Sequence, residues 1–473
     1  MPIRWWVACL SVVGLALGIV PAGAQNSEPD SKAAPPARPA IMFNRWQEDW
    51  SVLADPRVAR EPLDSLKYIP LSSTDPRSYL SFGFGARERF ETNNAANFGI
   101  GNNQNANYLL SRTELHADLN VAGRLKVFAQ LQSDFAPWKL MPTPVDLNNL
   151  DLEQAFIVLT QPVGKGLLKM RVGRQQFAFD LQRFVSVRDG PNVRQSYDAA
   201  WIDYEIEPWR LIAFYSRPVQ VQNFRPFDDY SSGQNTFTVG RVEHKWGEDA
   251  FLAAYYGRFT QDSAKYLSAS GDERRNVFDV HFAATRGGFD LDFEAMAQTG
   301  NIGDKGIWAW AAGAIVGYTL KEAAWSPRVG LQFDIASGND DPQGSTLGTF
   351  NPLFPNGYYF ALAGYTGYPN LIHLKPSLTL QPMKSMRVML AVAPQWRQTT
   401  ADAVYTQPNI PVPGTAGQPG SYTGAYGQLR LDWTLTPNLN FAVEAVHFAV
   451  SDVIRRAGGR DADWVGVQLT LAW

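Results

Sequence analysis

From Tyr79 to the last residue, apolar and polar side chains alternate along most of the chain with a period of two. The clearest runs are 80–91, 289–298, 328–335 and 464–473, in which almost every second residue is Leu, Val, Ile, Phe or Ala. A period of two places successive side chains on opposite faces of a strand. The pattern therefore predicts an all-β fold from Tyr79 onward, with one apolar and one polar face on each strand.

A soluble β-sandwich would alternate in the same way, so further features must decide between the two folds. The runs are about ten residues or longer, the length that a tilted strand needs to cross a membrane. Aromatic residues stand near many run ends, as girdles at the membrane interfaces require. Tight connections at 122–123, 287–288 and 437–438 alternate with long polar ones at 337–369 and 398–422. These features favour a transmembrane antiparallel β-barrel with short periplasmic turns and long outer loops.

The length of the repetitive region sets the size of the expected barrel. Residues 79–473 leave room for about 18 strands, and barrels of about 16 to 18 strands enclose an aqueous lumen. The last run alternates up to Trp473, the final residue. We interpret this aromatic end as the signal that the barrel-assembly machinery recognises, the alternative being a core strand that ends on Trp by chance.

The first 24 residues predict a signal peptide. Arg4 is followed by an apolar core over 5–20, and Ala22 and Ala24 are the small residues that a signal peptidase accepts. Cleavage near Ala24 would also remove Cys9, the only cysteine. We therefore expect a cysteine-free mature chain in the outer membrane of a Gram-negative cell, in contact with its lipid.

Residues 25–78 are predicted to be a periplasmic leader with one short helix. The stretch 25–40 is rich in Pro, Ala and Ser and offers nothing to bury, so it is expected to be disordered. Over 43–54, apolar residues recur at spacings of three and four and predict one amphipathic helix, which Asp55 and Pro56 end. This helix could be a plug or a helix packed across the periplasmic mouth.

Composition excludes several other classes. With 45% hydrophobic residues and a net charge of -3, the chain is neither disordered nor basic enough for nucleic acid. A single cysteine excludes a disulfide scaffold, a thiolate zinc site and an iron–sulfur protein. Beyond the first twenty residues, no run of about 18 apolar residues could span a bilayer as a helix.

The polar faces would line the lumen, where rings of charge decide what passes. Basic residues concentrate on or near the first strands: Arg87, Arg89, Arg112, Lys169, Arg171, Arg174, Arg183, Arg188 and Arg194. Acidic residues mark the polar faces of later strands: Asp290, Asp292, Glu294 and Asp334. Because the guanidinium fork suits carboxylates and phosphates, we predict an arginine-lined pore for anions. The alternative is that these charges mostly pair with one another.

The sequence has no nucleophile elbow, zinc-protease helix or phosphate-binding loop. His116 and His281 lie on predicted inward faces, so a barrel-embedded Ser/His hydrolase stays an alternative. The loop Asn339-Asp340-Asp341 could hold calcium, but its spacing does not match an EF-hand, and a solvated loop is the preferred interpretation. No catalytic residue, cofactor or metal is predicted.

Several segments resemble the alginate export family of outer-membrane proteins. They are MRVGRQ (170–175), RFVSVRDGPNVRQSYD (183–198), LGTFNPLFPNGYY (347–359), NLIHLKPSLTLQP (370–382), the final block 428–473 and RWQEDWSVL (45–53). The resemblance implies a monomeric 18-stranded barrel whose arginine-lined pore passes negatively charged polysaccharide. By the RVGRQ match, it also implies that Arg171 and Arg174 are pore residues. Both can point inward only if a bulge at Gly173 interrupts the alternation.

We therefore expect an outer-membrane channel that passes anionic, alginate-like polysaccharide or other anionic solutes, without chemistry of its own. The solute gradient or a periplasmic secretion partner would drive transport. A small-solute or general porin of the same fold is the alternative. A polymer exporter needs an unobstructed lumen wider than a sugar chain, whereas a small-solute porin can have loops folded deep inside.

Overall fold

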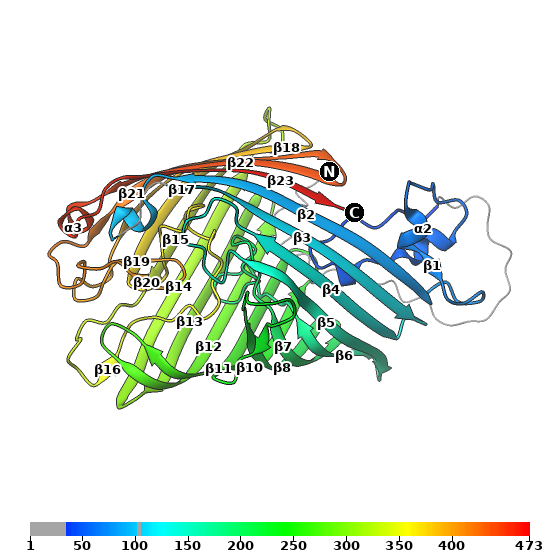
Figure 1. Cartoon of the computed structure of the whole chain (residues 1–473), viewed down its shortest axis with the longest axis horizontal. Helices are drawn as coiled ribbons and strands as arrows, with labels where there is room; N and C mark the ends of the chain where they lie inside the picture. Colours follow the sequence, from blue (N-terminus) through cyan, green and yellow to red (C-terminus); the bar gives the residue numbers. More distant parts are fainter. Residues whose placement is uncertain (1–34, 102–105) are drawn as a thin grey trace.

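A closed antiparallel barrel forms most of the molecule (Figure 1). The structure is a computed structural model that describes residues 35–101 and 106–473, so the predicted signal peptide lies outside the described residues. Each strand pairs with its neighbours in chain order, and β23 returns to pair with β2, which closes the sheet. The predicted all-β barrel of about 18 strands is thus confirmed.

Eighteen barrel strands lie in the described part of the chain: β2 (Tyr79–Asn93), β3 (Ala106–Val121), β4 (Leu125–Phe135), β5 (Asn148–Val163), β6 (Gly166–Gln175), β7 (Tyr197–Ile206), β8 (Trp209–Gln220), β10 (Asn235–Trp246), β11 (Ala250–Lys265), β12 (Ser270–Arg286), β13 (Phe289–Ile302), β14 (Lys305–Thr319), β15 (Arg328–Ala336), β17 (Leu371–Met383), β18 (Met386–Trp396), β21 (Tyr422–Thr436), β22 (Leu439–Val450) and β23 (Ala462–Ala472). Closure leaves no free sheet edge, which a structure surrounded by lipid requires.

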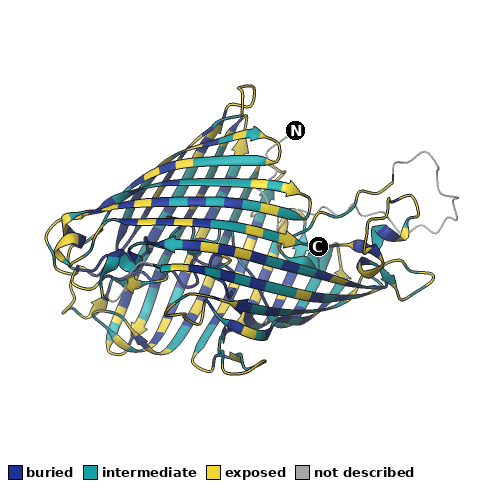
Figure 2. Cartoon of the chain, turned by 45° about the horizontal axis from the view of Figure 1, so that its top comes forward, coloured by how far each residue is buried: buried dark blue, intermediate teal, exposed yellow. Residues whose placement is uncertain are grey.

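The alternation read from the sequence places the apolar side chains outside and the polar ones inside. Figure 2 shows bands of buried and exposed residues alternating along the strands. On β15, Leu331 and Phe333 are exposed on the outer face, whereas Gln332 and Asp334 are buried on the inner face. A slip of one residue would exchange the two faces, so the pattern determines the register. No described helix is long and apolar enough to cross a membrane.

The connections differ strongly between the two ends of the barrel. At one end, two-residue turns join strands at 164–165, 287–288 and 437–438, and both the leader and the C-terminus lie there. The other end has long connections: 136–147, 176–196, 221–234, 337–370, 397–421 and 451–461. By the pattern of outer-membrane barrels, the first end is periplasmic and the second extracellular.

Short elements occur within the long connections and in the leader: α2 (Asp64–Lys67), β1 (Ile69–Pro70), η4 (Ala96–Gly99), β9 (Tyr230–Ser231), β16 (Thr346–Leu347), β19 (Tyr405–Thr406), β20 (Ile410–Pro411) and α3 (Asp452–Arg456). In the leader, β1 pairs with the first residues of β2. Arg38 donates to Asp64 at the start of α2, and this bond holds the pKa of the Asp64 carboxyl below its usual range.

The predicted helix over 43–54 is wrong in form. Two 3-10 turns occupy the region, η2 (Arg45–Gln47) and η3 (Trp50–Ala54), with Glu48 and Asp49 extended between them. The Glu48 carboxylate accepts bonds from Met42 N, Arg45 Nε and Trp50 Nε1. The Asp49 side chain accepts from Ser51 N at 3.0 Å. Side-chain bonds to nearby groups thus outcompete a continuous helix.

The apolar residues of this region are shared between two neighbourhoods. Trp50 and Leu53 pack with Tyr79 in a small core of the leader. Trp46 instead packs edge-on against Phe156, an inward-facing residue of β5, with ring centroids 5.6 Å apart. Arg45 Nη2 also donates to the Trp473 carbonyl at 2.8 Å. The segment therefore lies in the periplasmic mouth and is tied to the last residue of the barrel.

The first prediction tests the assignment of faces with single cysteines in a variant that lacks Cys9. Asp432 is 42% exposed on the inner face of β21, and Leu390 is 43% exposed on the outer face of β18. A membrane-impermeant thiol reagent should label Asp432→Cys and leave Leu390→Cys unmodified in lipid. Both should react after denaturation. Labelling of Leu390→Cys alone would mean that the register is shifted by one residue.

The second prediction concerns leader docking. Arg45→Ala should release the leader, because a charge-assisted hydrogen bond contributes about 1.5–3 kcal/mol, which corresponds to at least a tenfold rise in opening. Limited proteolysis within 35–67 measures the effect. Arg57→Ala is the matched control, since the ion pair of Arg57 with Asp55 stays within the leader. Equal cleavage of the two variants would contradict the docking role.

Candidate functional site: the inner face of the barrel

Two long connections, 176–196 and 337–370, fold into the lumen from the extracellular end. They meet at a parallel bridge between Val185 and Phe354, and the rings of Phe184 and Phe350 lie 5.4 Å apart. Aromatic residues of the barrel wall, including Trp201 and Phe214, belong to the same buried cluster. The lumen therefore contains a hydrophobic core, although its wall was predicted to be polar.

Arg87 and Arg112 hold the first of these connections. Both lie on the inner face, as predicted, and both are buried. Arg87 Nη1 donates to the Asp189 carbonyl at 2.6 Å, and Arg112 Nε donates to the Asn192 carbonyl at 2.7 Å. Arg112 Nη1 also contacts the Asp189 carboxylate at 2.7 Å. These guanidinium groups therefore bind the chain's own loop.

The other arginines around this connection add to the anchoring. Arg194 bonds to Glu114 and Asp189, and its guanidinium lies 4.7 Å from the ring centroid of Phe43 in the leader. Arg188 Nη2 approaches the Leu353 carbonyl at 3.5 Å, in the second connection. The predicted pore residues Arg188 and Arg194 thus join inward-folded segments to each other and to the leader.

Arg183 joins the predicted set of basic residues to the predicted set of acidic residues. Its Nη1 donates to Asp292 at 2.7 Å and to Glu294 at 3.0 Å, near the periplasmic start of β13. The connection 176–196 therefore contacts the wall in the periplasmic half of β13. Elsewhere on the wall, Arg89 is paired with Glu91 and Glu444. The alternative that these charges pair with one another applies to Arg89 and Arg183, whereas Arg87 binds backbone carbonyls instead.

Arg171 and Arg174 lie on opposite faces of β6. The pairings of β6 with β5 and β7 run without a register shift, so no bulge forms at Gly173. Arg171 points inward, where its guanidinium lies 5.2 Å from the Trp201 ring centroid and 4.9 Å from that of Trp46. Arg174 pairs with Asp198 on the outer side. The prediction that Arg174 lines the pore is therefore wrong.

A set of charges at the periplasmic end of the inner face was missed. Arg430 is 34% exposed and pairs with Asp432 and Glu444, and Arg387 stands opposite Asp432 in the register. Arg328 bonds to the predicted acidic residue Asp290. The signal was present, since these arginines occupy polar positions of alternating runs. This part of the wall presents solvent-accessible charges of both signs.

The inward histidines give the hydrolase alternative no geometric support. His281 Nε2 lies 2.8 Å from Asp292, and His116 stacks on Phe128 with centroids 5.4 Å apart. In the described part of the chain, neither is hydrogen bonded to a serine hydroxyl. The loop considered for calcium is also internally bonded, because Asn339 Oδ1 accepts from Gly348 N at 3.0 Å.

The third prediction tests the anchoring of the connection 176–196. Arg112→Met should loosen it, because the substitution removes the hydrogen bonds to Asn192, Asp189 and Pro191, and a hydrogen bond to a charged group contributes about 1.5–3 kcal/mol. Trypsin should then cleave faster at Arg188 and Arg194 in the folded protein. Arg286→Met, at an exposed position of β12, is the control. Unchanged cleavage in Arg112→Met would show that other contacts suffice.

Comparisons with known proteins agree with this architecture. The crystal structures of OccK8 (OprE), of OccK2 (OpdF) in complex with glucuronate and of the outer-membrane protein OpdK, all from Pseudomonas aeruginosa, share the fold with TM-scores of 0.56, 0.53 and 0.54. Their sequence identities are 11%, 12% and 9%, and each match covers 83% of this chain and 98% of the other.

Sequence comparison gives the family. A search of curated proteins found no match. The model of the family described as alginate export matches residues 78–468, which is nearly the whole barrel. Family and fold together indicate the Gram-negative outer membrane and a porin-like channel. The chain therefore belongs to the alginate export family of outer-membrane β-barrel proteins.

Proposed function

We propose that this channel passes small anionic solutes, with monomeric uronates and similar carboxylates as the substrate class. The observation that carries the proposal is the pair of connections, 176–196 and 337–370, that fill much of the lumen. A polymer exporter needs a lumen wider than a sugar chain. Passage of a polysaccharide would require these connections to leave the contacts made by Arg87, Arg112 and Arg183.

The charges at the periplasmic end support an anionic solute. Arg387 and Arg430 lie on the inner face of the paired strands β18 and β21, Arg328 lies on β15 with β17 between, and Arg430 is partly solvent-exposed. A positive charge beside a narrow passage raises the local concentration of anions, although acidic neighbours reduce the net effect. A carboxylate can also accept two parallel bonds from one guanidinium group.

Chemistry shared with related proteins points to uronates in particular. Alginate, after which the family is described, is a polymer of uronic acids. OccK2, which shares the fold, has been crystallised with glucuronate, a uronic acid monomer. We infer that the solute resembles the monomer, because the filled lumen does not favour the polymer.

The fourth prediction tests the role of the periplasmic charges. Arg430→Gln should move ion preference toward cations, and Asp432→Asn should move it toward anions. Both effects should shrink between 0.1 M and 1 M salt, because the Debye length falls from about 10 Å to about 3 Å. Reversal potentials in planar bilayers under a salt gradient, together with block by glucuronate, measure the shifts.

The control is Arg258→Gln, since Arg258 is exposed on the outer face of β11. It should keep the reversal potential of the unmodified protein. If Arg430→Gln also keeps it, the periplasmic arginines do not select the solute, and the anion proposal loses its electrostatic support.

A further inference from the structure

Three carboxylates meet where the inward-folded connection 176–196 touches the barrel wall. Asp180 belongs to that connection, Asp279 to β12 and Glu294 to β13. One carboxylate oxygen from each lies within 4.8 Å of the others. Asp279 and Glu294 are only 5% and 2% exposed, so water does not screen their repulsion.

Asp279 is not satisfied by the protein around it. Neither of its buried carboxylate oxygens has a hydrogen-bond partner among the described residues. Tyr255, which stands directly opposite Asp279 in the pairing of β11 with β12, has a buried hydroxyl that is also unpartnered. Burying an ionised carboxylate without a donor or a cation costs several kcal/mol, so Asp279 is stable here only with a bound proton or a bound cation.

The surrounding charges leave a negative surplus. Arg241 binds Asp180 through two bonds, and Arg183 binds Glu294 and Asp292. His281 lies between Asp180 and Asp292, at 3.0 Å and 2.8 Å. Glu243 also contacts Arg241, and Arg210 lies 3.5 Å from Glu243 but bonds more closely to Asp203, so Glu243 adds no positive charge to the cluster and is left out of the count. Four carboxylates then face two guanidinium groups, which leaves two negative charges with His281 neutral and one with it protonated.

We propose that Asp180, Asp279 and Glu294, together with the Tyr255 hydroxyl, bind a divalent cation, and that the cation is Ca²⁺. Carboxylate and hydroxyl oxygens are hard ligands, which suit Ca²⁺ and Mg²⁺ rather than the softer transition metals. Ca²⁺ accepts six to eight oxygens in irregular geometry, whereas Mg²⁺ demands a near-ideal octahedron. A site assembled from a loop and two tilted strands fits the more tolerant ion.

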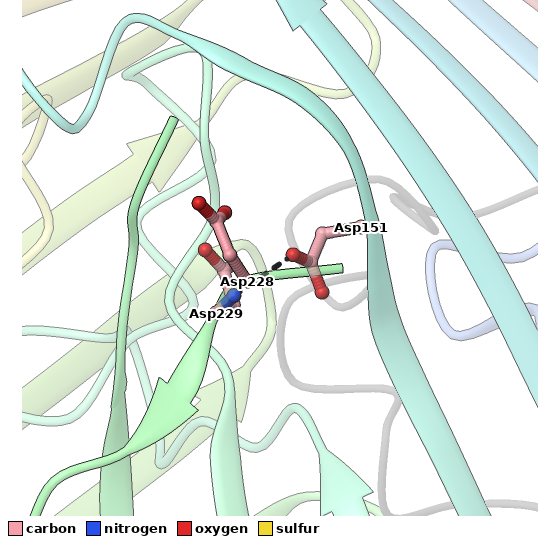
Figure 3. Close-up of side chains that lie close together, drawn as sticks. All are labelled: Asp151, Asp228 and Asp229. Atoms are coloured by element: carbon pink, nitrogen blue, oxygen red, sulfur yellow. Dashed lines mark hydrogen bonds between the residues drawn. The ribbon is translucent and has the colours of Figure 1, made fainter. Parts of the chain in front are cut away.

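A second group of acidic residues is satisfied more fully, since its carboxylates accept several backbone N–H bonds and only Asp228 Oδ1 is buried without a partner among the described residues. Asp151, Asp228 and Asp229 lie close together, and the Asp229 N–H donates to Asp151 at 3.0 Å (Figure 3). Asp228 accepts from the backbone of Phe224 and Arg225. In these bonds the carboxylates accept from the backbone of the connection 221–234 and stabilise its fold. Asp228 and Asp229 also remain partly exposed. This group therefore serves as the control site.

The proposed cation would have a structural consequence. Asp180 is the ligand from the connection 176–196, whereas the other three groups belong to the wall. A bound cation therefore holds this connection against β12 and β13, close to the anchor made by Arg183. Its removal should loosen the connection whatever solute the channel carries.

The fifth prediction tests the site on the purified, folded full-length barrel after treatment with a chelator. Tb³⁺, a luminescent substitute for Ca²⁺, should bind with one-to-one stoichiometry, and Ca²⁺ should displace it more readily than Mg²⁺. Asp279→Asn should weaken binding at least tenfold, and Tyr255→Phe should weaken it less. Asp228→Asn should bind as the unmodified protein does. Heat-modifiable migration verifies that each variant is folded.

A proteolysis experiment gives a second readout. Chelation should speed tryptic cleavage at Arg183 and Arg188 in the unmodified protein, whereas Asp279→Asn should be cleaved rapidly with or without Ca²⁺. Absence of Tb³⁺ and Ca²⁺ binding at millimolar concentration would overturn the proposal and mean that Asp279 takes up a proton instead. Binding that is lost in Asp228→Asn but kept in Asp279→Asn would also overturn it.

Discussion

A guanidinium group taken out of water needs acceptors for its N–H bonds and compensation for its charge. On the inner face of this barrel, Arg87 and Arg112 find those acceptors in the backbone of residues 189–192. Arg183, which the loop itself carries, finds them in Asp292 and Glu294 on the opposite wall. The same requirement draws the loop inward from both sides. The shape of the lumen therefore depends on buried arginines that hold the connection 176–196 against the barrel wall.

The pattern of the sequence predicted the features that depend on local periodicity. Alternation with a period of two is a property of neighbouring residues, so it identified the strands, their faces and their approximate number. It also placed Arg87, Arg112 and Asp292 on the inner face. The partners of these residues lie far away in the chain, as with Arg183 and Asp292, and no local pattern records such a contact.

The errors have equally specific causes. Arg174 was placed inward through a bulge at Gly173, but the continuous register with β5 and β7 puts it on the other face from Arg171. The spacing of Phe43, Trp46, Trp50 and Leu53 suits a helix, yet the bonds made by Glu48 interrupt it. Trp201 and Phe214 face a lumen that was expected to be polar, because inward-folded loops supply apolar partners. Strand register decided the first case, local side-chain bonds decided the second, and tertiary packing decided the third.

These features describe a channel with two regions of different character. Loops pinned by arginines fill much of the lumen, while charges of both signs remain accessible at the periplasmic end. The chain belongs to the alginate export family, and we propose that a lumen filled in this way admits uronate monomers rather than the polymer.

Size selectivity tests this account most directly. Liposomes that contain the purified barrel can be exposed to glucuronate and to uronate oligomers of increasing length, and their swelling rates compared. The account predicts entry of the monomer and a steep fall in rate with each added unit. Entry of long polyuronates at rates close to that of the monomer would contradict it.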